Sequence, residues 1–164
     1  MQRTAVWRWL RSGSVVGLLV AMCGCAPLPP TSTVSIPPIP AGMARVWFYR
    51  EDLPYVSQAR PYVRMNGAVV GISESGGAFY RDVPPGQYYV TVDSYGVDIN
   101  QFPYIAVVPG QTVYLQVLGS RYWASGGGGG RGSGWERPTF YVWLMPNDVG
   151  GMAVARSPFY PGDG

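Results

Sequence analysis

The sequence predicts an all-β protein: a single antiparallel β-sandwich of about seven to eight strands, behind a signal peptide and a proline-rich tether. Three observations lead to this fold class. Side chains alternate with a period of two along most of the chain after residue 43, turn sequences separate the alternating stretches, and no stretch has convincing helical periodicity. Only residues 149–156 are ambiguous between helix and strand. We therefore expect one β-sandwich domain over residues 44–156.

The first strand is predicted at residues 44–50, with the sequence ARVWFYR. Successive side chains of a strand point to opposite faces of its sheet. Val46 and Phe48 should therefore share one face, and Trp47 and Tyr49 the other. The sequence leaves open whether the aromatic face lies under another layer or meets water.

A hairpin is predicted at residues 62–72. YVRM and AVVGI flank Asn66-Gly67, and this dipeptide accepts the positive φ angles of a type I′ turn. Further on, Pro85 and Gly86 predict a type II turn, because that turn favours Pro at its second position and Gly at its third.

The later strands are separated by Pro and Gly turns. Pro109-Gly110 predicts that residues 102–108 and 112–118 form a second hairpin. Within it, alternate apolar residues point inward, namely Val113, Leu115 and Val117. The strands predicted after residue 75 lie at residues 78–83, 87–95, 102–108, 112–118 and 139–145.

Residues 1–24 are typical of a secretory signal peptide. Three arginines and no acidic residue precede the apolar run at 15–23, which is shorter than the ~20 apolar residues of a membrane-spanning helix. The run ends in Met22-Cys23-Gly24-Cys25, which resembles a bacterial lipobox. Cys23 departs from the usual Ala, Ser or Thr at its position. Gly24 makes Cys25 the better lipid acceptor, so Cys25 is the predicted first residue of the mature lipoprotein.

A lipid anchor at Cys25 would hold the domain at a bilayer, because each buried methylene of an acyl (palmitate) chain contributes roughly 0.8 kcal/mol. By resemblance to other lipoproteins, Ala26 after the cysteine implies sorting to the outer membrane, with the protein facing the periplasm. Residues 25–43 would then be the lipidated cysteine and a proline-rich tether, since such sequences form semi-rigid spacers of ~3.1 Å per residue. A proline-motif docking site is the alternative.

Composition excludes several functional classes. The chain has no His, and all twelve of its basic residues are Arg. Catalysis by Ser-His-Asp, Cys-His or Ser-Lys groups or by a lysine Schiff base is therefore impossible. Without the three leader arginines, nine Arg balance nine Asp and Glu, so no basic surface argues for nucleic acid. We expect no enzymatic activity, no metal and no cofactor.

Four stretches resemble the bacterial envelope family called domain of unknown function 2846. The family typically has an aromatic first strand, a V-x-V-N-G-x-x-V-G hairpin, a D-x-P-x-G turn into a long strand, and a G-Q/E-x-Y-Y hairpin. The corresponding stretches here are residues 44–50, 63–71, 82–92 and 110–115. The likeness covers residues 44 to about 118, and 139–156 would close the fold. Surface-associated β-modules of the PEGA type and peptidase-associated sandwiches are similar. The resemblance implies an exported sandwich domain and no catalytic residues.

Residues 119–137, GSRYWASGGGGGRGSGWER, are the most unusual internal stretch. Their glycines formally match a dinucleotide-binding fingerprint, but strands flank them on both sides, where that motif needs a following helix. One interpretation is a flexible insertion. The other is a contact loop for an envelope protein or a glycan, because aromatic residues and Arg are enriched in binding hot spots. Its candidate contact residues are Tyr122, Trp123, Arg131 and Trp135.

The functional hypothesis from sequence is a non-enzymatic envelope lipoprotein that acts as a protein-interaction or assembly module at the periplasmic face of the outer membrane. The alternative is a glycan- or peptidoglycan-binding module that uses the aromatic glycine-rich loop. Residues 157–164 are predicted to be a flexible tail, as chain ends of this composition usually are.

Overall fold

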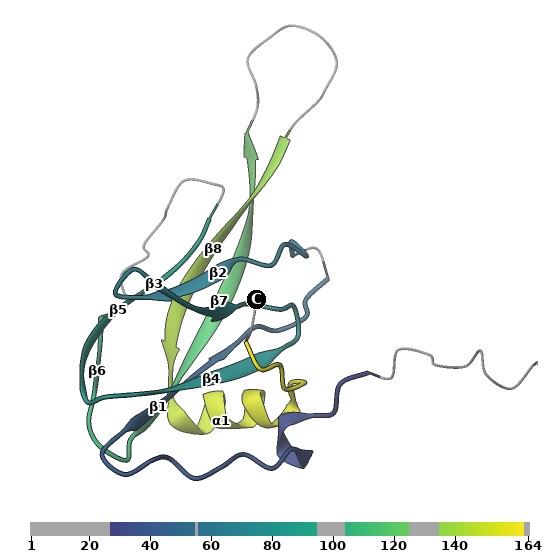
Figure 1. Ribbon diagram of the computed structural model, residues 1–164. Helices are drawn as coiled ribbons and strands as arrows, with labels where there is room; N and C mark the ends of the chain where they lie inside the picture. Colours follow the sequence, from purple (N-terminus) through teal and green to yellow (C-terminus); the bar gives the residue numbers. More distant parts are fainter. Residues whose placement is uncertain (1–26, 55, 95–103, 125–134, 163–164) are drawn as a thin grey trace, which may run out of the picture.

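The structure is a computed structural model that describes residues 27–54, 56–94, 104–124 and 135–162. Within these residues the chain forms two four-stranded sheets, one 3-10 turn η2 (Thr31–Thr33) and one α-helix α1 (Asn147–Arg156) (Figure 1). The fold is therefore mostly β, but the prediction of an all-β domain is wrong in one element. The helix α1 occupies the stretch whose sequence pattern was ambiguous.

The first sheet has the strand order β4-β1-β7-β8, and the second has the order β3-β2-β5-β6. The strands are β1 (Ala44–Tyr49), β2 (Tyr62–Met65), β3 (Ala68–Ile72), β4 (Ala78–Val83), β5 (Gly86–Val92), β6 (Tyr104–Val107), β7 (Thr112–Ala124) and β8 (Trp135–Met145).

Two predicted pairings are wrong. The sheets are not purely antiparallel, because β1 pairs with β7 in parallel, Trp47 beside Tyr114. Moreover, β6 and β7 do not form a hairpin: β6 pairs with β5 and β7 with β1 and β8. The turn with Gly110 at φ 76° exists, but it carries the chain from the second sheet to the first. A turn sequence indicates where a strand ends, whereas the choice of neighbour depends on long-range packing.

The Asn66-Gly67 hairpin is confirmed. Asn66 has a φ of 49° and Gly67 a φ of 83°, as a type I′ turn requires, and the turn joins β2 to β3. The predicted type II turn is not formed, because Gly86 has a φ of 157°, far from the value near 80° that this turn needs. Gly86 instead begins β5.

One core of buried side chains involves strands of both sheets. Val46 and Phe48 of β1 belong to it, and the Phe48 ring stacks on Phe79 with centroids 4.9 Å apart. Each fully buried side chain of this size contributes about 1.5–3 kcal/mol to folding. The core consists of Ala44, Val46, Phe48, Val63, Met65, Phe79, Val90, Val92, Ile105, Val107, Val113, Leu115, Val117, Phe140 and Val142.

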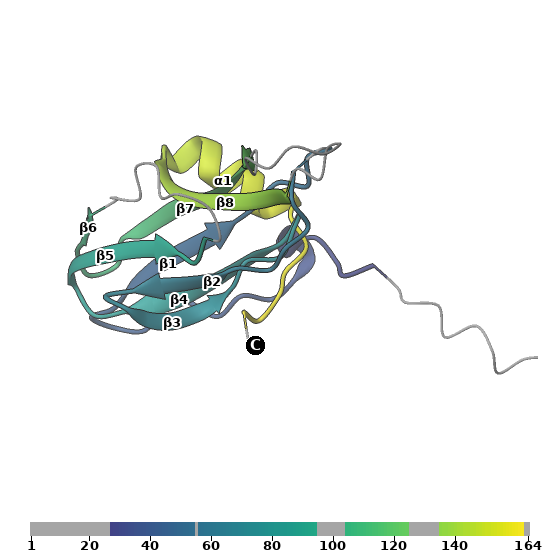
Figure 2. The same cartoon turned by 90° about the horizontal axis from the view of Figure 1, so that it is seen from above.

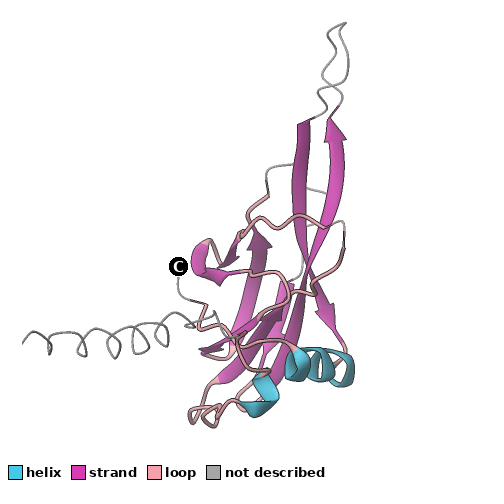
Figure 3. Cartoon of the chain, turned by 90° about the vertical axis from the view of Figure 1, so that its right-hand side faces the viewer, coloured by secondary structure: helices cyan, strands magenta, loops and turns pink. Residues whose placement is uncertain are grey.

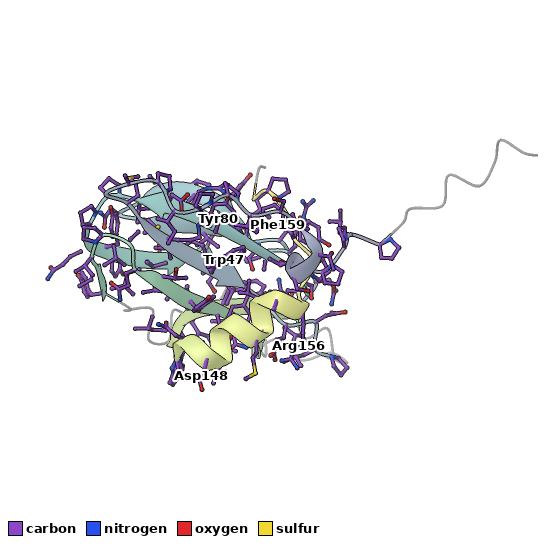
Figure 4. All side chains as sticks on the ribbon, turned by 90° about the horizontal axis from the view of Figure 1, so that it is seen from below. Trp47, Tyr80, Asp148, Arg156 and Phe159 are labelled. Carbon is purple, nitrogen blue, oxygen red and sulfur yellow. The ribbon has the colours of Figure 1, made fainter. Side chains whose placement is uncertain are left out.

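The outer face of the first sheet is covered as well. Trp47 lies there against Tyr80 and Phe159, with ring centroids 5.0 Å and 6.2 Å away (Figure 4). Ala153 and Val154 of α1 join the same apolar cluster. Figure 2 shows α1 on one side of the molecule and β3 on the other. The predicted aromatic face of β1 therefore lies under a third layer.

The two chain segments that flank the domain form much of this layer. Thr31 donates its backbone N–H and its hydroxyl to the Ser157 carbonyl, both at 2.8 Å. Ala78 of β4 donates to the Pro158 carbonyl at 2.9 Å, which brings the C-terminal segment along the edge of β4. Segments predicted as a spacer and a flexible tail thus pack against the sheet in their described parts. The domain boundaries stay predictions.

An ion pair fixes the rest of the N-terminal segment. Arg45 donates from Nε and Nη2 to the two carboxylate oxygens of Asp82, at 2.7 Å and 2.8 Å, and from Nη1 to the Pro37 carbonyl at 2.8 Å. Its guanidinium also lies 4.1 Å from the centre of the Tyr80 ring. The hydrogen bonds to Asp82 raise the pKa of Arg45. The N-terminal segment is therefore held to the domain at Pro37, whose carbonyl accepts a hydrogen bond from the buried Arg45 guanidinium.

Two neighbouring glycines of α1 test how the helix docks. A Cβ at Gly150 would lie 2.3 Å from the Tyr114 Cβ, whereas a Cβ at Gly151 would lie 3.5 Å from the Tyr114 hydroxyl. We expect Gly150→Ala to lower the free energy of unfolding by about 1–3 kcal/mol, because β7 cannot move away. Gly151→Ala should leave it unchanged or raise it by up to ~1 kcal/mol through helix propensity. Equilibrium urea unfolding measures both, and equal effects would contradict this docking.

Candidate functional site

The most prominent surface feature is a two-stranded ribbon formed by β7 and β8. The two strands pair from Tyr114 with Met145 to Ala124 with Trp135. β1 accompanies β7 only as far as Gln116, so the distal part of the pair has no third strand. It projects from the end of the molecule opposite α1 (Figures 1 and 3). A feature that leaves the body of the fold in this way is available for contacts.

The ribbon brings together three of the four residues predicted to contact a partner. The backbone of Tyr122 pairs with Arg137, that of Trp123 with Glu136, and that of Trp135 with Ala124. The two tryptophans are therefore close in register but are not cross-strand partners. Arg131 lies outside the described residues, and so does Cys25.

The connection between the two strands is shorter than the predicted insertion at residues 119–137. β7 continues to Ala124 and β8 begins at Trp135, so both ends of the insertion are strand. The residues SRYWA continue β7 directly, and the neighbouring glycine run obscured this extension in the sequence. Aromatic residues such as Tyr122, Trp123 and Trp135 are enriched in strands, which fits the observed extension.

The base of the ribbon holds a buried arginine that the sequence analysis missed. Arg50 is 1% exposed and lies with its guanidinium 4.8 Å from the centre of the Phe140 ring of β8. It donates from Nη1 to the Ala59 carbonyl at 2.7 Å and from Nη2 to the Ser57 carbonyl. Its Nε has no hydrogen-bond partner among the described residues. Desolvation lowers the pKa of Arg50, since burial disfavours the charged form.

Arg50 therefore holds the connection between β1 and β2 against the ribbon. Val56 of that connection lies so near β7 that a Cβ at Gly119 would be 2.7 Å from the Val56 Cγ1. No sequence signal marks Arg50, because an arginine after an apolar strand usually faces water. The connection between β1 and β2 therefore packs against both strands at the base of the ribbon.

A second exposed surface is the outer face of the second sheet. Tyr104 is 70% exposed and its ring centroid lies 5.2 Å from that of Tyr89. Arg64 binds Asp93 with both carboxylate oxygens, from Nε at 2.7 Å and from Nη2 at 3.0 Å. This pairing raises the pKa of Arg64. Tyr62 and Tyr104 of this sheet are exposed, whereas the outer face of the first sheet is covered.

A shallow depression of about 330 Å³ lies between β3 and the C-terminal segment. Its one charged group, Arg81, donates from Nη1 to the carbonyls of Tyr80 and Pro161 and from Nη2 to that of Gly162. The guanidinium is therefore engaged in holding the C-terminal segment. The lining residues are Tyr62, Val69, Val70, Gly71, Ile72, Arg81 and Gly162.

The described residues contain no group of three or more Asp, Glu, His or Cys side chains that could hold a metal ion. Nor does that part of the chain include a helix of the length and apolar character needed to cross a bilayer.

Comparison with known proteins found no matching family model, no similar curated protein and no similar solved structure. The resemblance to domain of unknown function 2846 therefore stays a prediction.

Substitution of Arg50 tests the support of the ribbon. We expect Arg50→Lys to lower the free energy of unfolding by about 2 kcal/mol, because a single ammonium cannot satisfy both carbonyls and the Phe140 ring in the same geometry. Arg60→Lys is the matched control, because Arg60 has a side chain 61% exposed and pairs with Glu74. A surface change of that kind should stay within ~0.5 kcal/mol. Chemical denaturation measures both, and equal stabilities would show that Arg50 does not hold the connection.

Proposed function

We propose that the protein is a lipoprotein of the outer membrane, anchored at Cys25 and facing the periplasm, whose two sheets form one β-sandwich. It acts there as a non-enzymatic interaction or assembly module. The lipobox and the signal-peptide pattern support the address. The shared core of the two sheets supports the sandwich.

The observation that carries the proposal is the placement of the two ends of the molecule. The N-terminal segment contains η2, which packs against α1. The ribbon projects from the opposite end of the molecule (Figures 1 and 3). A domain held at the membrane through Cys25 would therefore direct the ribbon away from that membrane. Tyr122, Trp123 and Trp135 would lie where a partner could reach them.

The side-chain types at the ribbon favour a protein partner. Tyr, Trp and Arg dominate binding hot spots, and the ribbon carries all three in its strands. A two-stranded ribbon also has two edges whose backbone groups can pair with a further strand. Both properties suit an assembly contact.

The described carboxylates support a non-enzymatic role, since three of them form ion pairs with arginines. Asp82 binds Arg45, Asp93 binds Arg64 and Glu74 binds Arg60. Asp52 accepts a hydrogen bond from the Ser75 hydroxyl at 3.0 Å.

A second candidate function is glycan binding, as for a module that contacts peptidoglycan. The exposed tyrosines of the second sheet, Tyr62 and Tyr104, favour it, and the Arg64–Asp93 pair joins β2 to the end of β5 in the same sheet. Aromatic faces suit sugar rings, and the ion pair offers hydrogen bonds to hydroxyls.

Substitution at the lipobox tests the address. We expect Cys25→Ser to release the protein from the membrane fraction, because the acyl chains are then lost. Cys23→Ser is the control and should leave the protein in that fraction, since Met22 precedes Cys23 and is too bulky for the processing site. Fractionation followed by immunoblotting measures both. Membrane association of the Cys25→Ser protein equal to that of the unchanged protein would contradict the anchor.

Photo-crosslinking in cells tests the partner. A photoreactive residue at Trp123 should give one dominant protein adduct, identified by mass spectrometry. The same residue at the exposed Val69 of β3 is the control and should not give that adduct. Should position 123 give no protein adduct in the anchored and folded protein, cosedimentation with purified sacculi decides for the glycan alternative. In that case Tyr62→Ala with Tyr104→Ala should weaken sedimentation, and a Trp123→Ala change should not.

A further inference from the structure

The free edge of β8 in the body of the first sheet lies apart from the distal ribbon. β8 is the last strand of the first sheet and pairs with β7 on one side only. Residues 139–146 at this edge, TFYVWLMP, carry no charge. Trp143 is 59% exposed and Leu144 is 47% exposed. Exposed strand edges of this apolar, uncharged kind pair readily with other strands.

The hydrogen bonds of Phe140 reveal which backbone groups the edge presents. The Phe140 N–H donates to the Ser94 Oγ at 3.1 Å, so it points away from β7. In an antiparallel pair, alternate residues direct both backbone groups to the same side. Val142 and Leu144 therefore direct their N–H and C=O groups to the free edge as well. Neither residue makes an inter-strand bond there to any other described residue.

The backbone groups of Val142 and Leu144 at this edge can pair with the same groups of a second copy related by a two-fold axis. Val142 and Leu144 lie on either side of Trp143, so a symmetry axis through Trp143 would pair Val142 of each copy with Leu144 of the other. The pairing leaves the Phe140–Ser94 bond in place. It also sets the two Trp143 residues directly opposite one another, where aromatic pairs add about 0.5–1.5 kcal/mol beyond the area they bury.

The other edge of the same sheet shows how this chain treats an open strand. The C-terminal segment lies along β4, with Ala78 bonded to Pro158 and Tyr160 bonded back to the Ala78 carbonyl at 2.9 Å. The chain thus pairs the start of the β4 edge, at Ala78, with its own backbone, and no described segment does the same for Val142 and Leu144. Val142 is 4% exposed because its side chain belongs to the core, so the exposed side chains at this edge are those of Trp143 and Leu144.

We propose that β8 pairs with β8 of a second copy of this chain, antiparallel and centred on Trp143, so that the two first sheets join into one continuous sheet. The absence of charge on this edge favours a second copy, since identical charged edges would repel each other. This inference is independent of the proposed function, and its tests require neither the anchor nor the ribbon partner.

Cysteine crosslinking tests the register of the pairing. In such an antiparallel pair the Cα atoms of opposed residues that do not exchange hydrogen bonds lie about 4.5 Å apart, which a disulfide can span. In the purified full chain in detergent, Trp143→Cys should form a reducible dimer under mild oxidation. Leu144→Cys should not, because its copies lie two positions out of register, farther than the ~7 Å limit. Val69→Cys on β3 and the unchanged chain give the background. Crosslinking at 143 no greater than at 69 or 144 would overturn the proposal.

A charge at the axis gives a second measurement that does not depend on disulfides. Sedimentation equilibrium of the unchanged chain should show a dimer, and Trp143→Arg should raise its Kd at least about tenfold by placing two guanidiniums opposite each other. Val69→Arg is the matched control and should leave the Kd unchanged. The exposed position of Trp143 keeps the fold intact, which urea unfolding verifies. A monomeric unchanged chain, or equal Kd values for the two variants, would refute the paired edge.

Discussion

The burial of β1 on both of its faces is the constraint on which the rest of the fold depends. All six of its residues are buried, with Val46 and Phe48 toward the second sheet and Trp47 and Tyr49 away from it. A strand with large side chains on both faces cannot lie at the surface of a two-layer protein. The helix and the two flanking segments therefore form a third layer, and Arg45 enters it with Asp82 as its partner. The described part of the Pro-rich stretch and the C-terminal segment up to residue 162 pack on the domain because this face has to be covered.

The sequence was a good guide wherever structure is local. Period-two alternation located the strands, and the Asn66-Gly67 pair specified its turn, because the positive φ angles depend only on those two residues. Pairing between distant segments was not predictable in the same way. The parallel β1–β7 pair and the separation of β6 from β7 are decided by packing across the core, which no short stretch encodes. Proline content likewise indicated an extended segment without indicating that Thr31 and Pro37 would find partners on the domain.

For the candidate site, the types of residue in the sequence indicated a contact element, but the sequence did not indicate how that element is held in place. Aromatic residues on both sides of a glycine run indicated a contact element, and strand pairing brings Tyr122, Trp123 and Trp135 to one end of the ribbon. The support of that ribbon was invisible in the sequence, since Arg50 looks like an ordinary arginine that follows a strand. Its role follows from the carbonyls of Ser57 and Ala59, seven and nine residues further along the chain, and from the Phe140 ring on another strand. Buried cations are rare enough that composition gives no reason to expect one.

The pairing of the first and last described segments has a mechanical consequence. A pull on the N-terminal segment reaches the fold through Thr31 and Pro29, whose bonds to Ser157 and Phe159 join it to the C-terminal segment. From there the load passes to the edge of β4 through Ala78. Traction at one terminus is therefore borne by the other terminus and by the rim of the sheet before it reaches β1. The first and last described segments act as one clasp, which would have to open before tension could extract the central strand.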